Sequence, residues 1–368
     1  MKRIISSILC AAFMLSALSG CGAGDDLQSS STAENEFSSQ SGQEIEANVS
    51  DDTEKEKVKA SFLEKANQVK VDENTVTFVD GTDNEVTINK NPQKPVSLYG
   101  SLSTLWYEAG GKLHGTIGGD SSIALYEEYI GHDITKDEGV KVLADSSSGK
   151  KWDVESIIAS EPDLIICSMA MSGYATIKEP ANAANIPVIA VEYNDFSDYL
   201  KWFKVFCSLN NQEELWDSVA MKSLDSVADI ITSVNSESKP KVFSMLSGSK
   251  SLQANTSNTV LGSMITQLGA ENIVDLWENK DKAERLEINL ETVVASDPDI
   301  ILVQCHADGE TAQQQVKKIY GDNEVWNSLR AVKEGKVFYL QKSLFHNKPN
   351  SKFADAYKVL SDILYNEN

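Results

Sequence analysis

The sequence has few basic residues and, beyond its N-terminus, no long apolar run. Lys and Arg number 33 against 55 Asp and Glu among 368 residues, which gives a formal net charge of −22. A chain this acidic repels phosphate backbones, so we expect no nucleic-acid partner. No stretch of about 20 apolar residues follows the N-terminus, so no membrane-spanning helix is predicted.

Cysteine is scarce, and several enzyme motifs are missing. The five cysteines form no CxxC pair. Cys10 and Cys21 belong to the N-terminal region, whereas Cys167, Cys207 and Cys305 stand among apolar or β-branched neighbours. These three are predicted to be buried free thiols, although an exported chain permits one disulfide. The sequence has no GxSxG, HExxH, P-loop or GxGxxG motif, so we predict no enzymatic activity.

The first 21 residues have the layout of an export signal. Basic residues at positions 2 and 3 precede a mostly apolar run that ends in the motif Leu-Ser-Gly-Cys, with Cys21 last. This motif is similar to a bacterial lipobox, whose cysteine becomes the lipidated first residue of the mature protein. We therefore predict a signal peptide over residues 1–20 and a lipid on Cys21, which anchors the chain to the outer face of the cytoplasmic membrane. A plain signal peptide is the alternative.

Two similar folded regions follow an acidic segment. Residues 21–66 are rich in Ser, Gln, Asp and Glu, and we expect a disordered tether because so little apolar surface is available to offset the ordering entropy. Strands and helices then alternate, beginning with a hairpin predicted around Gly81. The alternation stops at residues 196–237, which are helical in period, and restarts near Lys241. The sequence predicts an α/β fold of two similar lobes, 67–195 and 238–368, with mainly parallel sheets joined by one long helix.

Each predicted lobe contains a version of the same short unit. DVESIIASEPDLII begins at Asp153 and NLETVVASDPDIIL begins at Asn289, and both initial residues are good helix N-caps. Glu155 and Glu291 fall in the first turn, off the apolar face, so we expect both to face water. A carboxylate at a helix start is favourable by itself, but that does not require glutamate at equivalent places in both lobes.

These features together resemble the substrate-binding lipoproteins of ABC importers, and more narrowly the group that binds iron-siderophores, haem and cobalamin. NPQKPVSLYG (91–100) is similar to the group's approach to its first core strand, and the repeated units are similar to its Glu–helix–Pro-Asp segments. GSMITQLGAENIV (262–274) and VWNSLRAVKEGKVFYL (325–340) look like later segments of the group, with Ala270 in place of the more usual Gly. The resemblance covers about residues 70 to 365.

The resemblance implies a function and partners. It implies two rigid lobes with a ligand cleft between them, and Glu155 and Glu291 as the carboxylates that dock on basic residues of the permease. Its partners would be the ABC permease and its ATPase subunits, with the chain itself a monomer that has no intrinsic cofactor. The ligand would be an iron-siderophore complex, with haem and cobalamin as alternatives. A surface or adhesive lipoprotein without a transport role is the alternative of a different class.

Ligands of open α/β sheets bind beyond the carboxyl ends of the strands. Applied to each predicted strand end, this rule indicates candidate contacts in both lobes. Aromatic and Met side chains among them suit a large, flat or greasy ligand. In lobe one the candidates are Tyr99, Ser101, Ser103, Trp106, Met169, Met171 and Tyr174. In lobe two they are Ser247, Ser249, Lys250, Gln253, His306, Phe345, His346 and Lys348.

Histidine placement disfavours a bare metal ion. Only His306 and His346 follow strands of lobe two, and no histidine matches them at a strand end of lobe one. A zinc or manganese site needs about three to six converging ligands. A chelated or organic ligand is therefore favoured, and an axial histidine to haem iron stays possible.

Overall fold

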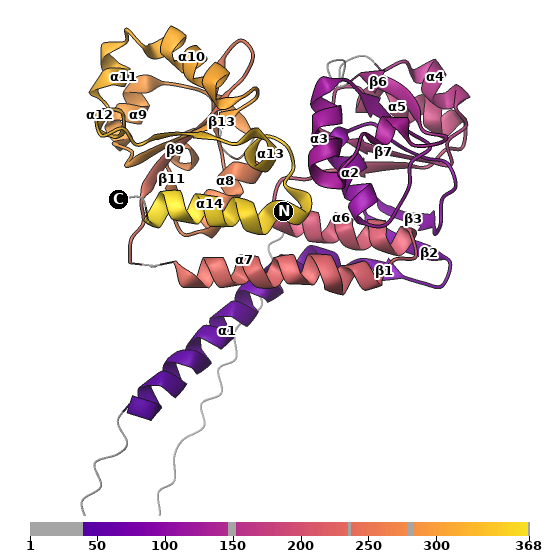
Figure 1. Ribbon diagram of the computed structural model, residues 1–368, viewed down its shortest axis with the longest axis horizontal. Coiled ribbons are helices and arrows are strands. Elements are labelled where there is room, and N and C mark those ends of the chain that lie inside the picture. Colours follow the sequence, from indigo (N-terminus) through magenta and orange to yellow (C-terminus); the bar gives the residue numbers. More distant parts are fainter. Residues whose placement is uncertain (1–39, 146–151, 235–236, 279–280, 282, 367–368) are drawn as a thin grey trace, which may run out of the picture. The chain divides into compact units, whose positions relative to one another are not determined.

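The computed structural model describes residues 40–145, 152–234, 237–278, 281 and 283–366. The predicted signal peptide and Cys21 lie outside these residues. Both lobes lie within one compact unit that begins at Asn48. In Figure 1 lobe one lies at the right in purple and lobe two lies at the left in orange.

Lobe one is built on a five-stranded sheet in which all neighbouring strands are parallel. Its interior strand β7 is mostly apolar and is buried throughout, as expected of a strand covered on both faces. The sheet order is β6 (Lys141–Asp145), β5 (Gly115–Gly118), β4 (Pro95–Ser97), β7 (Leu164–Ser168) and β8 (Val188–Val191). The helices are α2 (Gly100–Glu108), α3 (Asp120–Ile130), α4 (Val154–Ala159) and α5 (Tyr174–Ala183).

Lobe two repeats this plan with one antiparallel strand. Its six-stranded sheet keeps β9, β11, β13 and β14 parallel, and β10 runs antiparallel to its neighbours. The strands are β9 (Lys241–Ser247), β10 (Leu252–Asn255), β11 (Glu271–Asn272), β12 (Arg285–Glu287), β13 (Ile300–Cys305) and β14 (Val337–Leu340). The helices are α8 (Val260–Gln267), α9 (Leu290–Ser296), α10 (Gly309–Tyr320), α11 (Glu324–Ser328), α12 (Arg330–Lys333), α13 (Lys342–Phe345) and α14 (Phe353–Tyr365). The predicted α/β fold with mainly parallel sheets is confirmed.

A small antiparallel sheet precedes lobe one. It contains β1 (Lys70–Val71), β2 (Thr75–Val79) and β3 (Glu85–Asn89), and β2 and β3 form the predicted hairpin. The Asp80 carboxylate accepts the backbone N–H of Thr82 at 2.8 Å and so shapes the turn. Gly81 donates its N–H to the Ala190 carbonyl at 2.8 Å, which fastens the turn to the end of β8.

The segment predicted as one long inter-lobe helix over residues 196–237 forms two helical parts instead. Helix α6 (Phe196–Leu209) ends where Asn211 takes a left-handed conformation, with φ of 52°. Helical structure resumes as a π-helical segment (Trp216–Met221) that leads directly into α7 (Lys222–Ser233). Asparagine tolerates this backbone conformation better than most residues, which explains the break. Because α6 is buried along most of its length, it belongs to the core of lobe one.

The prediction of a disordered tether up to residue 66 is wrong from Gln40 onward. Helix α1 spans Gln40–Asn67, and its last turns bury Phe62 and Ala66. The Phe62 ring meets the ring of Phe196 on α6 edge-to-face, with centroids 5.1 Å apart. The acidic composition does not reveal this packing, because only a few apolar residues on one face of α1 make it.

Ion pairs reinforce the attachment of α1. Lys59 pairs with Asp225 of α7 at 2.8 Å, and Lys65 pairs with Asp198 of α6 at 2.7 Å. Helix α1 therefore contacts both helices on either side of the break between α6 and α7. Tertiary contacts of this kind stabilise a helix that intrinsic propensity alone leaves marginal.

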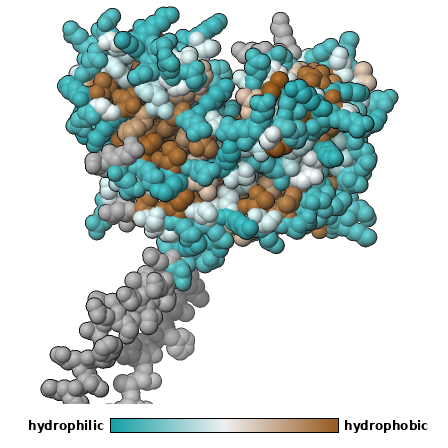
Figure 2. All heavy atoms as spheres, in the orientation of Figure 1, coloured by the Kyte–Doolittle hydropathy of each residue, from teal (hydrophilic) through white to brown (hydrophobic). Residues whose placement is uncertain are grey.

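Both lobes bury their apolar residues against their sheets. In Figure 2 hydrophobic residues gather toward the middle of each lobe, with hydrophilic residues around them. Cys167, Cys207 and Cys305 are free and buried, as predicted. None of the helices in the described ranges is both long and apolar enough to cross a membrane.

Replacing Phe62 tests whether α1 belongs to the folded core. Phe62→Ala should lower the free energy of unfolding by about 3 kcal/mol, because it removes a buried ring and leaves a cavity. Urea unfolding of a chain that starts at residue 21 measures the change. Glu64→Ala, an exposed change on the same helical turn, should stay within about 0.5 kcal/mol of the parent. Equal stability of the Phe62 variant and the parent would show that α1 does not pack there.

Candidate functional site

The two repeated units have the same local structure. The side chains of Asp153 and Asn289 cap α4 and α9 by accepting backbone N–H groups at 3.0–3.2 Å. Glu155 and Glu291 follow in the first turn of their helices, and both are exposed. Each lobe therefore presents one glutamate to solvent at an equivalent helix start.

The Pro-Asp parts of the units brace the sheets. Asp163 accepts the backbone N–H of Lys94 at 2.9 Å, just before β4. Asp299 accepts the N–H of Lys241 at 2.7 Å, at the start of β9. These carboxylates lie at the amino ends of the strands, where they hold neighbouring strands in register. A structural role therefore accounts for both aspartates.

Two predicted ligand contacts of lobe one are wrong. Ser103 and Trp106 are completely buried in α2. The Ser103 hydroxyl lies 2.8 Å from that of Thr116. The Trp106 indole donates to the Lys112 carbonyl at 3.1 Å, and its ring packs edge-on against Phe206. Both residues lie on the buried face of α2, where the sheet encloses Ser103 and α6 encloses Trp106.

Tyr99 and Ser101 lie where lobe one meets lobe two. Burial raises the pKa of the Tyr99 phenol, whose charged form would also feel Glu284 and Arg285 of lobe two. The Ser101 hydroxyl accepts the backbone N–H of Lys348 at 3.2 Å. Ser101 therefore contributes a hydrogen bond that joins the two lobes.

The remaining candidates of lobe one follow β7. Met169 is 36% exposed, and Met171 and Tyr174 are partly buried. Met169 also contacts the hairpin turn, since a Cβ atom at Gly81 would lie 2.6 Å from its sulfur. These three side chains form a soft, uncharged group at the carboxyl end of β7, and their contact with ligand stays a prediction.

In lobe two the structure brings the two predicted histidines together. The His306 Nδ1 and His346 Nε2 atoms lie 3.0 Å apart, with the rings nearly perpendicular. Burial, together with the nearby His306, Lys342, Arg285 and Lys348, lowers the pKa of His346 to about 3. Burial likewise lowers the pKa of His306, with a contribution from Lys342. Both imidazoles are therefore neutral at physiological pH.

Lys348 extends from lobe two into lobe one. Its ammonium donates to the Tyr193 carbonyl and lies 5.1 Å from the centroid of the Tyr193 ring. Burial lowers its pKa to about 8, whereas Glu284 and Asp198 favour the charged form. This lysine is therefore mostly protonated at neutral pH. The acids near it only partly offset the effect of burial.

The other candidates of lobe two divide by burial. Phe345 is 1% exposed in the core, and its carbonyl accepts the Gln304 side chain at 2.6 Å, so its ring makes no ligand contact. Ser247 is buried at the end of β9. Ser249 and Lys250 are exposed in the turn before β10, and Gln253 is partly buried within β10. Their roles stay predictions.

Sequence reasoning missed Glu284, Arg285 and Lys342. The Arg285 guanidinium donates to Glu284 at 3.1 Å and to the Asn255 side chain at 3.1 Å. Lys342 of α13 reaches across to the Ser121 hydroxyl at 3.3 Å. Arg285 begins β12, a short strand whose charged residues give no clear period-2 signal. No local pattern marked it as part of the site.

Asn350 joins the lobes near the same place. It is fully buried with φ of 51°, a left-handed conformation that asparagine accepts more readily than most residues. Its amide donates to the Ser101 carbonyl at 2.8 Å and to the Thr104 hydroxyl at 2.9 Å, and its oxygen accepts the Tyr193 hydroxyl at 3.2 Å. All three partners belong to lobe one, so this residue of lobe two is locked into the other lobe.

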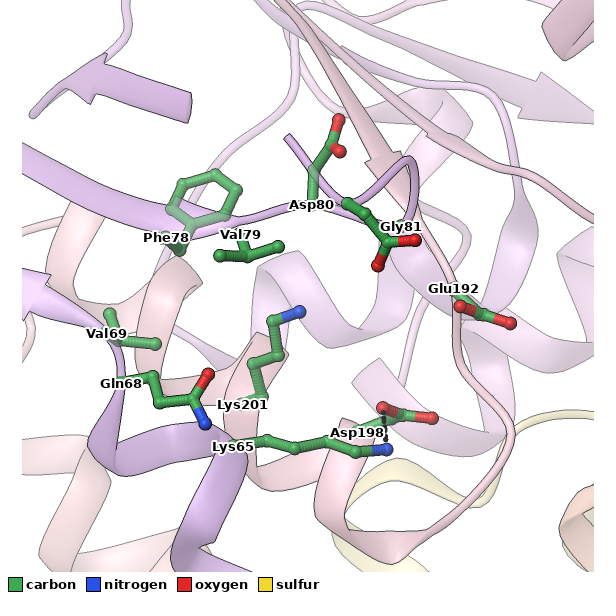
Figure 3. Close-up of a pocket in the computed structure, with 11 residues that line it drawn as sticks. Lys65, Gln68, Val69, Phe78, Val79, Asp80, Gly81, Glu192, Asp198 and Lys201 are labelled. Atoms are coloured by element: carbon green, nitrogen blue, oxygen red, sulfur yellow. Dashed lines mark hydrogen bonds and ion pairs between the residues drawn. The ribbon is translucent and has the colours of Figure 1, made fainter. Parts of the chain in front are cut away.

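A separate cavity lies between the end of α1, the hairpin turn and α6. Its volume is about 190 Å³, and four of its lining residues are acidic: Asp80, Asp83, Glu192 and Asp198. Figure 3 shows Lys201 extending into it between the Lys65–Asp198 ion pair and the hairpin. Pockets for drug-sized ligands measure about 300–1,000 Å³, so this cavity is too small for a siderophore or tetrapyrrole.

Within the described part of the chain, no three His, Cys, Asp or Glu side chains converge in a way that holds a metal ion. The junction between Tyr99 in lobe one and the Arg285, His346 and Lys348 group in lobe two is thus the best candidate site. It combines the strand-end position with a concentration of charge.

Comparison with known proteins supports a transport role. A family described as periplasmic binding protein matches residues 96–344. The Bacillus subtilis (strain 168) protein named "Uncharacterized ABC transporter substrate-binding lipoprotein YvrC" is 23% identical over 295 residues, which cover 79% of this chain and 85% of that protein.

Solved structures show the same fold. Staphylococcus aureus IsdE complexed with haem has a TM-score of 0.60 at 18% identity, covering 74% of this chain and 98% of that one. Bacillus subtilis FeuA, a triscatecholate siderophore binding protein complexed with ferri-bacillibactin, has a TM-score of 0.59 at 17% identity. The match covers 76% of this chain and 95% of that one. The chain belongs to the periplasmic binding protein family, as a substrate-binding protein of the ABC importer type.

Proposed function

We propose that this chain is an extracytoplasmic, lipid-anchored binding protein that captures an iron-siderophore-type complex between its lobes and delivers it to an ABC permease. The observation that carries the proposal is the contact between the lobes at Ser101, whose hydroxyl accepts the backbone N–H of Lys348, two residues after the paired His346 of lobe two. Haem and cobalamin are the alternative ligands, and the chain binds its ligand without chemical turnover.

The lobes are braced so that any closure on ligand is small. Asn350 is hydrogen-bonded within lobe one, and Phe353 of α14 packs against Phe196 of α6 with centroids 4.9 Å apart. Moving one lobe relative to the other would leave the buried amide of Asn350 without partners, which is costly. Binding therefore relies on a site that is formed in advance.

Ligand binding itself provides the primary test. A bound ligand at about 100 times its Kd should stabilise the folded chain by about 2.7 kcal/mol. We expect a raised Tm in a thermal-shift screen of ferric siderophore complexes, haemin and cyanocobalamin. No shift with any of these compounds would exclude the proposed ligand group and favour a surface lipoprotein without a transport role.

Lipid anchoring is proposed from Cys21 and from the lipoprotein name of the Bacillus subtilis relative. Cys21→Ala should move the protein from the membrane fraction to a soluble form, because the predicted thioether-linked lipid has no other attachment point. Fractionation of cells followed by immunoblotting measures this. Identical fractionation of Cys21→Ala and the parent would contradict the anchor.

Glu155 and Glu291 are proposed to dock on the permease. Both are exposed, and each occupies the same position of the repeated unit in its lobe. A two-lobed protein can then place one carboxylate on each half of a permease. Exposed charge pairs of this kind steer association and fix orientation more than they add affinity.

Charge reversal tests the docking role. Glu155→Lys and Glu291→Lys should fold and bind ligand as the parent does, because both side chains are exposed and distant from the junction site. Each should impair import in cells, the double variant should nearly abolish it, and Ala should be milder than Lys at both positions. Glu127→Lys, an exposed change on α3, is the control and should import normally. Full import by the double Lys variant at parental expression would reject the docking role.

A further inference from the structure

A carboxylate of lobe one contacts lobe two beside the segment that joins the lobes. Glu108 is the last residue of α2, and its Oε1 atom accepts the Ser351 hydroxyl at 2.5 Å. Ser351 lies in a short 3-10 turn, Asn350–Lys352, whose Asn350 side chain is hydrogen-bonded within lobe one. Glu108 therefore bonds the residue next to the one that is locked into the other lobe.

The second carboxylate oxygen of Glu108 is buried alone. Its Oε2 atom has no hydrogen-bond partner within the described residues, although the residue as a whole is partly exposed. Negative charge on a buried oxygen without a donor is costly, because buried polar atoms normally have a partner. A proton on Oε2 removes this charge and leaves Oε1 free to accept the Ser351 hydroxyl. The inter-lobe contact is therefore less costly to keep when the carboxyl group is protonated.

The cation that acts on this carboxylate has other partners. Lys352 lies in the same turn as Ser351, but its ammonium pairs with Glu128 of α3 at 3.0 Å. The same ammonium lies 4.4 Å from the centroid of the Tyr129 ring. Its attraction for Glu108 favours the ionised carboxylate without outweighing the effect of burial. The charge of Glu108 is thus incompletely balanced at the place where the lobes meet.

The other titratable groups around this contact supply no positive charge. They are three tyrosines and two exposed acids: Tyr129, Tyr193, Tyr199, Glu128 and Asp355. Burial raises the pKa of the three phenols, and the charge of Glu108 raises it further, so all three are neutral at physiological pH. The Tyr129 hydroxyl donates to the Ser343 carbonyl at 3.1 Å, which is a further bond between the lobes.

We propose that Glu108 is a proton-controlled latch between the lobes. Its protonated form keeps the turn Asn350–Lys352 packed on α2, and its ionisation loosens that turn together with the inter-lobe bonds beside it. Burial raises the pKa of Glu108 to about 7, although the Ser351 hydrogen bond and Lys352 favour the ionised form. The latch belongs to the scaffold, so it depends neither on the identity of the ligand nor on the transport role.

The direction of the pH effect follows from the raised pKa. The folded chain holds this proton more tightly than the unfolded chain does, in which the pKa of a glutamate is about 4.5. The stabilising contribution of the protonated group is therefore complete below about pH 4.5 and is lost as the pH rises through about 7. Lys348 lies three residues before Ser351, so we expect its inter-lobe hydrogen bond to Ser101 to open more often above about pH 7.

Glu108→Gln tests the latch, because glutamine has the shape of a protonated glutamate and cannot ionise. Hydrogen exchange of a peptide that covers residues 342–352 is measured by mass spectrometry. Parent and variant are compared at the same pH, so that the intrinsic effect of pH on exchange cancels. At about pH 8.5 the parent should exchange at least about tenfold faster than the variant, and at about pH 5.5 the two should agree within about twofold. Urea unfolding at the same two pH values should show the same trend.

Two further variants separate ionisation from the loss of a contact. Ser351→Ala removes the donor that favours the ionised carboxylate, so it should move the midpoint of the pH response upward. Glu127→Gln, an exposed change on α3, should keep the parental response. Equal exchange in the parent and Glu108→Gln at both pH values would overturn the latch. Faster exchange in Glu108→Gln at both pH values would overturn it as well, because it would show a contact that does not depend on ionisation.

Discussion

The aromatic packing between α6 and α14 holds the two lobes together, and the candidate site depends on it. Phe353, at the start of α14, meets Phe196 of α6 with centroids 4.9 Å apart and Tyr199 at 5.5 Å. Three residues earlier, Asn350 is hydrogen-bonded to lobe one. Because Lys348 lies in the same short segment, the contact that joins the lobes also sets the position of a cation at the junction. Ligand recognition and inter-lobe rigidity therefore share one segment.

Helix α1 extends the same support to the other side of α6. Phe62 packs on Phe196, so one ring of α6 contacts both the N-terminal helix and the C-terminal helix of the chain. Lys65 forms ion pairs with Asp195 and Asp198, two of the acids that act on Lys348. The N-terminal helix thus contributes to the charge balance of the site without touching it.

Duplication of the α/β lobe separates two tasks within the fold. The helix starts at Glu155 and Glu291 are equivalent in both lobes, and their exposed carboxylates suit a partner with matching halves. The carboxyl ends of the strands are not equivalent, since lobe one offers Tyr99 and methionines and lobe two offers cations and histidines. The two lobes therefore share the same exposed glutamate at a helix start, but they present different side chains at the junction between them.

The sequence by itself determined the features that depend on local periodicity. The hairpin of β2 and β3, the buried strands β7 and β13, the capped starts of α4 and α9 and the exposure of Glu155 and Glu291 all follow from patterns within about fifteen residues. The restart of the strand–helix alternation and the repeated unit indicated the two-lobed arrangement, and family resemblance agreed with it. These elements needed no knowledge of distant contacts, because apolar spacing and capping residues specify them directly.

Only the tertiary structure decided which polar and aromatic residues meet. Trp106 has the composition of a ligand contact, but Phe206 on α6 encloses it in the core. Phe62 and Lys65 order a helix within a segment whose composition suggests disorder, because their partners lie on α6. Arg285 lies on a short strand without a clear pattern, and its bond to Asn255 of β10 exists only in the folded sheet. Burial and electrostatic interaction are sums over neighbours that folding brings together from distant parts of the chain, and local sequence does not contain those neighbours.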